Sequence, residues 1–312
     1  MNANRTGPFL LLLTLTSGAV SATPSLGEAS GFNVFALGNL TQLGGDSEGP
    51  VAIGGSASLA SLAVNARNVD APYGLVVGGS LQATDGTLNG NLAYGRAAEL
   101  SSFTVSGKAS QSSPIDFISA RIDLEARSAY WASSLSSAWL GKVTYFDWGG
   151  VTLAGTDRTL NVFNVDGSRV RSTLHISAPE GSTVLVNVSG KSNSWSGFKM
   201  QTSGVDKTHL LFNFFESTSV AISSLSFQGT LFAPKADLTL ESGNIEGNTV
   251  ANNVTATWWS GEFHNQPFTG TIPFESLESG GAPTPEPATL LVIGAGLIAI
   301  AAAVKTKKAV QP

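Results

Sequence analysis

Two short apolar segments of this chain end in the same pair of glycines. Residues 51–56 read VAIGGS, and residues 75–80, 24 positions further on, read LVVGGS. Nearer the C-terminus, Gly229 and Gly247 are 18 positions apart, and apolar residues alternate with polar ones between them. Repeats of this irregular length, with glycine at the corners, are typical of the stacked coils of a β-solenoid. A β-sandwich, with a strand about every 8–12 residues, is the alternative that the periodicity leaves open.

The central part of the chain, residues 23–274, is predicted to form one mainly β domain. No linker divides it, and about 250 residues are enough for a single core. Only 12% of the residues in the chain are charged, against about 25% in an average domain. The 35 glycines, together with many Ser, Thr and Asn residues, supply turns and polarity instead. This composition favours short strands that are joined by tight turns.

One segment, about residues 114–140, is predicted to be a long amphipathic helix that packs along the β body. Ser113 suits the N-cap, Pro114 suits the first helical position, and Gly141 supplies the stop. The residues that fall on the apolar face of this helix are Phe117, Ala120, Leu124, Trp131, Leu135 and Ala138. A single helix in a β protein must bury such a stripe against the sheet.

The N-terminus has the layout of a secretory signal peptide. Arg5 is followed by an apolar run over residues 9–15, and small residues then lead up to Ala22. This order of charge, apolar run and small residues predicts cleavage after Ala22. Residues 1–22 would then be removed, and the domain would be exported.

The C-terminus combines a linker, an apolar run and a basic tail. Residues 275–287 are rich in Pro and Gly, residues 288–304 carry no charge, and residues 305–312 follow them. The basic residues of the tail are Lys305, Lys307 and Lys308. The apolar run would be about 26 Å long as a helix, close to the lower limit for a bilayer span. We therefore predict a transmembrane helix in the inner membrane, with the lysines in the cytoplasm.

The linker ends in Pro285-Glu286-Pro287. This motif, the apolar run and the basic tail together resemble the PEP-CTERM sorting signal of Gram-negative bacteria. The resemblance covers residues 285–312, and it implies an exosortase-type processing protease as a partner. It also implies a precursor that is transiently anchored in the inner membrane, and a mature form at the cell surface or outside the cell. The residues that would carry the sorting signal are Pro285, Glu286, Pro287, Lys305, Lys307 and Lys308.

Ser47 lies in a G-x-S-x-G pattern, Gly45 to Gly49, which marks the nucleophile of many hydrolases. A nucleophile elbow needs a helix after the serine, but Pro50 and a β-type run follow here. The three histidines of the chain lie in strand-like surroundings, so none is indicated as a catalytic base. We therefore interpret Ser47 as a turn residue, expect no catalytic residue, and do not expect the chain to be an enzyme.

The sequence also argues against a cofactor, a metal ion and nucleic acid. Its His, Asp and Glu residues do not have the spacing of a metal site, and the chain has no Cys. The formal net charge is −5, and the basic cluster is the C-terminal one, so nucleic acid is an unfavourable partner. Trp258-Trp259 could offer one ring to a sugar, but burial of these indoles is the usual role.

Residues 31–59 resemble the opening of the choice-of-anchor A family. They contain an apolar strand (32–37), an acidic turn that ends in Glu48-Gly49, and the run VAIGG (51–55). Members of this family carry alternative surface anchors, Pro-Glu-Pro tails among them, and the resemblance implies an adhesive domain. The helix and the segment 227–233 also resemble, more loosely, ice-binding β-solenoids that pack a helix along one side.

The function predicted from these features is adhesion by a non-catalytic β domain at the cell surface or in the extracellular matrix. Exopolysaccharide of a biofilm matrix is the favoured ligand, because proteins with such tails tend to occur in bacteria that make it. A secreted hydrolase acting on polysaccharide or ester substrates is one alternative. Ice binding is the other, although Thr239 and Thr249 stand alone rather than in the ranks that an ice-binding face usually needs.

Overall fold

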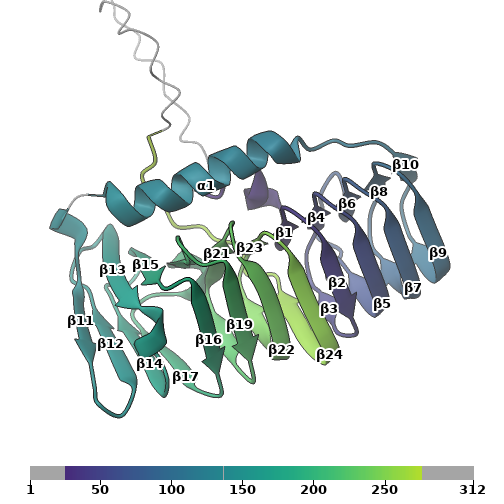
Figure 1. The fold of residues 1–312 in the computed structure, drawn as a ribbon. Coiled ribbons are helices and arrows are strands. Elements are labelled where there is room, and N and C mark those ends of the chain that lie inside the picture. Colours follow the sequence, from purple (N-terminus) through teal and green to yellow (C-terminus); the bar gives the residue numbers. More distant parts are fainter. Residues whose placement is uncertain (1–24, 136, 276–312) are drawn as a thin grey trace, which may run out of the picture.

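The structure is a computed structural model, and it describes residues 25–135 and 137–275, except the side chains of residues 258–260. These residues form a parallel β-solenoid with the helix α1 (Phe117–Ser133) along its side (Figure 1). The predictions of a mainly β fold and of a solenoid with a packed helix are therefore confirmed, and the β-sandwich alternative is wrong. The predicted signal peptide and transmembrane helix lie outside the described residues. Within the described part, no helix is long and apolar enough to cross a bilayer.

Each coil of the solenoid has three sides, which we name faces A, B and C. Face A lies under α1, and faces B and C meet at a corner on the opposite side of the coil. Four long strands turn this corner at a residue in the left-handed region, with φ of 57° at Ser61, 49° at Asp85, 51° at Ser102 and 50° at Ser242. Short polar side chains tolerate this conformation better than β-branched ones do.

The strands of the three faces have the following bounds. Face A contains, in spatial order, β10 (Ala109–Gln111), β8 (Leu92–Tyr94), β6 (Leu75–Val77), β4 (Val51–Ile53), β1 (Val34–Ala36), β23 (Thr249–Ala251), β21 (Thr230–Ala233), β18 (Leu210–Asn213), β15 (Thr183–Ser189) and β13 (Leu160–Asp166). Face B contains β16 (Ser192–Ser196), β19 (Ser219–Ser223), β22 (Asp237–Glu246), β24 (Val254–His264), β2 (Leu40–Leu43), β5 (Ala57–Val64), β7 (Leu81–Leu88) and β9 (Ala98–Val105). Face C contains β11 (Lys142–Tyr145), β12 (Gly150–Ala154), β14 (Thr173–Ser177), β17 (Lys199–Ser203), β20 (Ser226–Gln228), β3 (Asp46–Ser47) and the distal ends of the long strands of face B.

The coils are not stacked in the order of the sequence. The chain starts in the middle of face A with β1 and builds outward through β4, β6 and β8 to β10 (Figure 1). Helix α1 (Phe117–Ser133) then runs back along face A to the other end, and the second series of coils returns from β13 to β23. There β23 pairs with β1, and β24 pairs with β2 and β3. We name this junction of the first and last coils the seam.

Stacked glycines explain the repeat that is visible in the sequence. Val51 of β4 pairs with Leu75 of β6, so the two VAIGGS-like segments lie side by side in neighbouring coils. A Cβ added at Gly78 would collide with the carbonyl oxygen of Gly54, and one added at Gly247 would collide with that of Gly229. A side chain at these corners would therefore push adjacent coils apart, which is why the sequence repeats glycine there.

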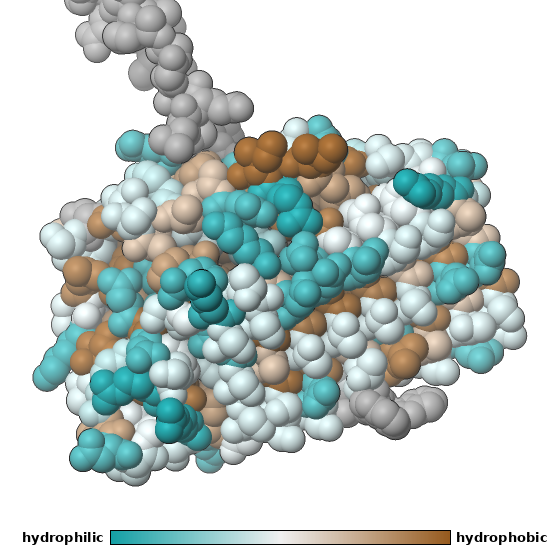
Figure 2. Space-filling model, viewed as in Figure 1, coloured by the Kyte–Doolittle hydropathy of each residue, from teal (hydrophilic) through white to brown (hydrophobic). Residues whose placement is uncertain are grey.

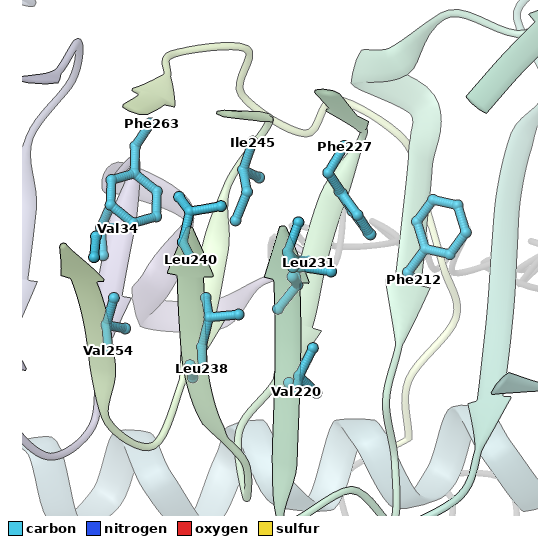
Figure 3. Packing of buried hydrophobic residues seen from close by; sticks show 14 of the residues in the cluster. Val34, Phe212, Val220, Phe227, Leu231, Leu238, Leu240, Ile245, Val254 and Phe263 are labelled. Carbon is cyan, nitrogen blue, oxygen red and sulfur yellow. The ribbon is translucent and has the colours of Figure 1, made fainter. Parts of the chain in front are cut away.

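The main core lies between the three faces (Figure 3). Its inward side chains stack in rows from strand to strand, as do Val220, Leu238 and Val254, which are paired in register and about 1% exposed. Aromatic rings fill the core near β16, where the ring of Trp195 lies 5.4 Å from that of Phe214. Burial of a side chain of this size contributes about 1.5–3 kcal/mol. Because a shift of one residue would turn every row outward, these rows fix the register.

Helix α1 is shorter than the predicted helix over residues 114–140. Its N-cap is Asp116, which accepts hydrogen bonds from the backbone N–H groups of Ile118 and Ser119, and not Ser113. The helix ends at Ser133, whose hydroxyl donates to the Ala129 carbonyl at 2.9 Å. The predicted bounds are therefore wrong at both ends. Asp caps a helix as well as Ser does, and serines near a helix end compete for backbone groups, so the residue types alone do not locate the ends.

Apolar and polar contacts together hold α1 on face A. Leu124 and Trp131 are at most 1% exposed, in a second core layer between the helix and the sheet. The hydroxyl of Ser128 donates to Asn213 Oδ1 at 2.6 Å, and Asn213 Nδ2 donates back to the Ser128 carbonyl at 2.8 Å. Asn187 of the next strand donates to the Trp131 carbonyl at 2.9 Å. Because these amides are buried, their bonds to the helix satisfy groups that water cannot reach, and they fix where the helix docks.

Candidate binding face

Face B carries a row of outward-pointing side chains, most of them short, which we name the threonine row. Thr239 stands beside Thr255, and Thr255 stands beside Thr41, because their strands pair in that register. The full row, one residue from each strand, is Ser194, Ala221, Thr239, Thr255, Thr41, Ser58, Gln82 and Glu99. All are exposed or half-buried, whereas the residues that flank them in the central strands are buried. The row therefore crosses the whole of face B.

The geometry of the sheet makes this face a regular grid. Neighbouring strands lie about 4.8 Å apart, and residues i and i+2 of one strand lie about 6.6 Å apart. Two residues beyond the threonine row, a second outward row includes Ser196, Ser223, Glu241, Thr84 and Ser101. Figure 2 shows the result as a broad surface of mostly intermediate hydropathy. Hydroxyl and methyl groups thus repeat in two directions over an extended surface.

An open groove lies on face B over β5, β7 and β9. Its volume is about 630 Å³, and its lining includes Asn39, Thr41, Ser58, Gln82 and Glu99. Gln82 Nε2 lies 3.4 Å from Glu99 Oε2, so donor and acceptor groups of these side chains meet at the groove. Amide, hydroxyl and carboxylate groups on one shallow surface suit a polar polymer better than a small apolar ligand.

Ser47 is not a turn residue, so the sequence interpretation of its position is wrong. It lies in the short strand β3, is completely buried, and pairs in register with Phe263 of β24 and Val64 of β5. Its hydroxyl donates to Gln42 Oε1 at 3.3 Å. The pattern of two glycines around a serine gave no sign that a strand from the far end of the chain would pair here. The partner that the structure gives this hydroxyl is an amide oxygen and not an imidazole.

A cluster of charged side chains lies at the seam on face C. His264 Nδ1 is 2.6 Å from Glu246 Oε1, and His264 Nε2 is 3.3 Å from Glu262 Oε2. Lys207 Nζ is 2.6 Å from the other oxygen of Glu246. Such a network can hold coils together through charge-assisted hydrogen bonds. Among the described residues, no group of three or more His, Asp and Glu residues is arranged to hold a metal ion.

This cluster shifts the titration of two of its members in opposite directions. Burial lowers the pKa of His264, but the hydrogen bond to Glu246 and the charge of that carboxylate outweigh it, so the pKa is raised above its usual 6.5. Burial raises the pKa of Glu246, but hydrogen bonds from Lys207 and His264 outweigh it, so the pKa is lowered from its usual 4.5. Both shifts favour the charged pair.

The other residues that the sequence singled out are dispersed. His175 Nε2 lies 3.0 Å from Ser203 Oγ, and His209 Nδ1 lies 3.2 Å from Thr208 Oγ1, so each of these histidines contacts a hydroxyl. The side chains of Trp258 and Trp259 are outside the described residues. So are the cleavage residue Ala22 and the sorting residues Pro285, Glu286, Pro287, Lys305, Lys307 and Lys308, whose roles stay predictions.

The expectation that Thr239 and Thr249 stand alone is half right. Thr249 lies in β23 and is completely buried, so it belongs to no outer face. Thr239 has Thr255 and Thr41 as neighbours in the threonine row. A local signal existed, because each of these three threonines follows a buried apolar residue within its strand. What the sequence could not supply was the register that places residue 41 beside residue 255.

Two protein families match the chain. The first, described as "Putative Ice-binding-like adhesive domain", matches residues 25–265. The second, the PEP-CTERM protein-sorting motif, matches residues 283–307. The second match supports the predicted sorting signal and implies processing by an exosortase at the membrane. No curated protein matches the chain.

Several solved structures of ice-binding proteins are similar to the chain at low identity. One, from an Antarctic Biological Consortium, is 14% identical with a TM-score of 0.40, and the match covers 82% of this chain and 95% of that one. Another, from the Antarctic ascomycete Antarctomyces psychrotrophicus, is 13% identical with a TM-score of 0.41, over 77% and 96% of the two chains. A domain of an ice-binding protein from Shewanella frigidimarina is 11% identical with a TM-score of 0.40, over 79% and 97%.

Proposed function

The chain belongs to the family of ice-binding-like adhesive domains, and from that premise we propose that face B is its adhesive surface. The ligand is an extended polymer with a regular repeat, and exopolysaccharide of the extracellular matrix is the class that fits best. The domain acts by binding alone, without catalysis. The choice-of-anchor A assignment, which rests on residues 31–59, is part of this proposal.

The observation that carries the proposal is the threonine row. A polysaccharide chain offers hydroxyl groups along its length. The Ser, Thr, Gln and Glu side chains that seven of the eight strands contribute to the row can donate to and accept from many of them at once. Each contact is weak because water competes for it, so affinity comes from the number of contacts. The groove between Asn39 and Glu99 adds a place where the polymer can be partly enclosed.

Ice is the second candidate ligand, and one observation favours it. Thr239, Thr255 and Thr41 are consecutive in the threonine row, so hydroxyl and methyl groups repeat at the strand spacing over the middle of face B. A rigid repeat of this kind can match a lattice of ordered water. Glu99 and Glu241 on the same face are exposed charges that hold water in other arrangements, and they favour the polysaccharide.

A pair of substitutions tests the role of face B. The double variant Thr41→Tyr, Thr255→Tyr places two large rings in the middle of the threonine row. The matched control is Thr87→Tyr, which changes an exposed threonine on face C of the same solenoid. We expect the double variant to lose co-sedimentation with purified exopolysaccharide and the control to keep it. Equal binding by both variants would overturn the proposal, and loss of ice-recrystallisation inhibition by the double variant alone would favour ice.

We also propose that the tail delivers this face to the cell exterior. The described chain ends at Glu275, beside the ring pair of Tyr130 and Phe274 on the helix side of the solenoid. The PEP-CTERM motif follows at residues 283–307. An exported precursor that is held through residues 288–304 would therefore be attached on the side of α1 and leave face B free to bind.

Replacement of Pro285-Glu286-Pro287 by alanines tests this delivery. The alanine variant should still insert into the inner membrane, because residues 288–304 are unchanged, but it should not be released. Wild-type protein should be recovered outside the inner membrane with its ends near Thr23 and Pro287. Mass spectrometry that finds Lys305–Lys308 on the mature protein would show that the tail is a permanent anchor instead.

A further inference from the structure

The two ends of the solenoid differ in how they are closed (Figure 1). At one end, η2 (Ser137–Trp139) packs against β13, η3 (Gly167–Arg169) packs against β16, and β11 extends face C as an antiparallel edge strand beside β12. Strand β16 is an edge strand there, but its core side chain Trp195 is only 1% exposed and donates to the Gly167 carbonyl at 3.1 Å. At the other end, β9 pairs only with β7, and β10 only with β8, among the described residues. Solenoids need a polar cap at each end to stay soluble alone.

The bare end presents side chains that occupy core positions. Leu100 of β9 is in register with Ala83 of β7, which is 2% exposed, yet Leu100 itself is 40% exposed. The core positions of β9 are Ala98, Leu100, Phe103 and Val105. Natural edge strands are usually blocked by Lys, Pro or a short length, but β9 spans eight residues with Glu99 as its one charge.

The backbone of β9 is also directed off this end. In the preceding coil, the backbone groups of residues whose side chains point into the core bond the neighbouring coil nearer this end. Leu81 N–H donates to the Ala97 carbonyl at 2.8 Å, and the Leu88 carbonyl accepts from Ser106 N–H at 3.0 Å. By the same repeat, the inward residues of β9 point their N–H and C=O groups away from β7. Four such residues on one strand, on both sides of the corner, form an unpaired ladder.

We infer that this end is a self-association surface, on which a second copy of the chain docks end to end about a two-fold axis. Such an axis makes the two β9 strands antiparallel. Only one register places the core-facing residues of one β9 strand opposite those of the other on both sides of the corner. It places Leu100 opposite Phe103 of the second copy and Ala98 opposite Val105, so that apolar side chains of the second copy cover the exposed Leu100 and the half-buried Ala98 and Val105. A slip of one residue would place Leu100 opposite an outward side chain.

The same axis also pairs β10. An axis that passes between Ser101 and Ser102, at the corner of β9, and crosses the coil to face A would also bring β10, whose central residue is Ser110, beside its copy. Ala109 then lies opposite Gln111 of the second copy. All three residues of β10 are exposed in the single chain. One symmetry operation therefore pairs the edges on all three sides of the coil, and face B of one copy continues into face C of the other.

Cysteine cross-linking tests both the surface and its register. The chain has no Cys, so the only disulfides are those that are introduced. In the proposed register, Glu99 lies opposite Thr104 of the second copy in a pair without backbone hydrogen bonds, at about 4.5 Å between Cα atoms, which a disulfide can span. Full-length Glu99→Cys and Thr104→Cys chains are produced together in cells that export them. We expect a disulfide-linked dimer in the mixture and none with either variant alone.

A matched control and a blocking variant complete the test. Glu99→Cys with Ser101→Cys places the two sulfurs about three residues, or about 10 Å, out of register, so no dimer is expected. Leu100→Lys in both chains of the cross-linking pair should abolish the dimer and leave the melting temperature of the monomer unchanged, because this side chain is already part exposed. Absence of dimer in the Glu99→Cys and Thr104→Cys mixture would overturn the inference. So would equal cross-linking in the control pair or by Glu99→Cys alone.

Discussion

Faces A and B are built from the same coils, yet face A is interior and face B is surface. On face A the outward residues are apolar, as at Phe35, Val76 and Leu211, and α1 buries them completely. On face B the outward residues at the centre are Thr41, Thr255 and their short polar neighbours. Both faces are built from parallel strands, so the difference lies in the residues that each strand turns outward. A face of this solenoid is thus made interior or surface by the side chains that it turns outward.

The largest expected effect comes from a charge under the helix. Leu124→Asp places an unpaired carboxylate in the layer between α1 and face A, where Leu124 is completely buried. We expect a loss of about 4 kcal/mol or more in the free energy of unfolding. The matched control is Ile122→Asp on the same helix, because Ile122 is 65% exposed. Urea melts that are equal for the two variants would show that α1 is not docked on face A.

The second effect comes from the polar contacts of the same layer. Asn213→Ala removes the amide that exchanges two hydrogen bonds with Ser128 and leaves buried groups of the helix unpaired. We expect a cost of about 2–3 kcal/mol in thermal or urea unfolding. Thr239→Ala on face B, the control, should cost less than about 0.5 kcal/mol. If Asn213→Ala costs no more than the control, the hydrogen bonds between Asn213 and Ser128 do not help to dock the helix.

The third effect is a pH dependence of stability that arises at the seam, where the first and last coils of both face A and face B are joined. The pKa of His264 is raised in the folded state, so its contribution to stability is present below its unfolded value of 6.5 and is lost as pH rises through the folded pKa. The pKa of Glu246 is lowered, so its contribution is present above 4.5 and is lost as pH falls through the folded pKa. We expect the melting temperature to fall by about 2–4 °C between pH 6 and pH 9.

His264→Gln provides the control for this pH dependence. Gln keeps a polar side chain beside Glu246 but does not titrate, so the decline above pH 6 should be absent in this variant. If scanning calorimetry gives the same pH profile for the variant and the wild type, other groups are responsible for the decline.

The smallest effect is expected at Ser47. Ser47→Ala removes a buried hydroxyl that bonds Gln42 at 3.3 Å and should cost about 1 kcal/mol in the free energy of unfolding. Ser101→Ala, at an exposed position of face B, should be neutral within about 0.5 kcal/mol. Ser47→Ala should not alter binding to exopolysaccharide, because Ser47 is completely buried. An esterase activity that is lost in Ser47→Ala, with folding unchanged, would make this residue a nucleophile after all.

Local features of the sequence predicted much of the fold. The glycine pairs after Ile53 and Val77 indicated stacked coils, because glycine at a corner is required by the neighbouring coil whichever coil that is. The apolar stripe through Leu124 and Trp131 indicated a docked helix, because an amphipathic helix must bury that stripe somewhere. Both predictions depend on residues that are close in the sequence.

The tertiary structure alone decided which coils are neighbours. Nothing local to residue 41 or residue 255 indicates that the first and last coils of the domain meet at the seam, and this meeting both creates the threonine row and buries Ser47 beside Phe263. The same holds for the bare end. Leu100 occupies a core position in its repeat and is exposed because, in the part of the chain that the structure describes, no strand pairs with the free edge of β9. Periodicity specifies what a coil contains, but the order in which coils stack follows from burial summed over the whole chain.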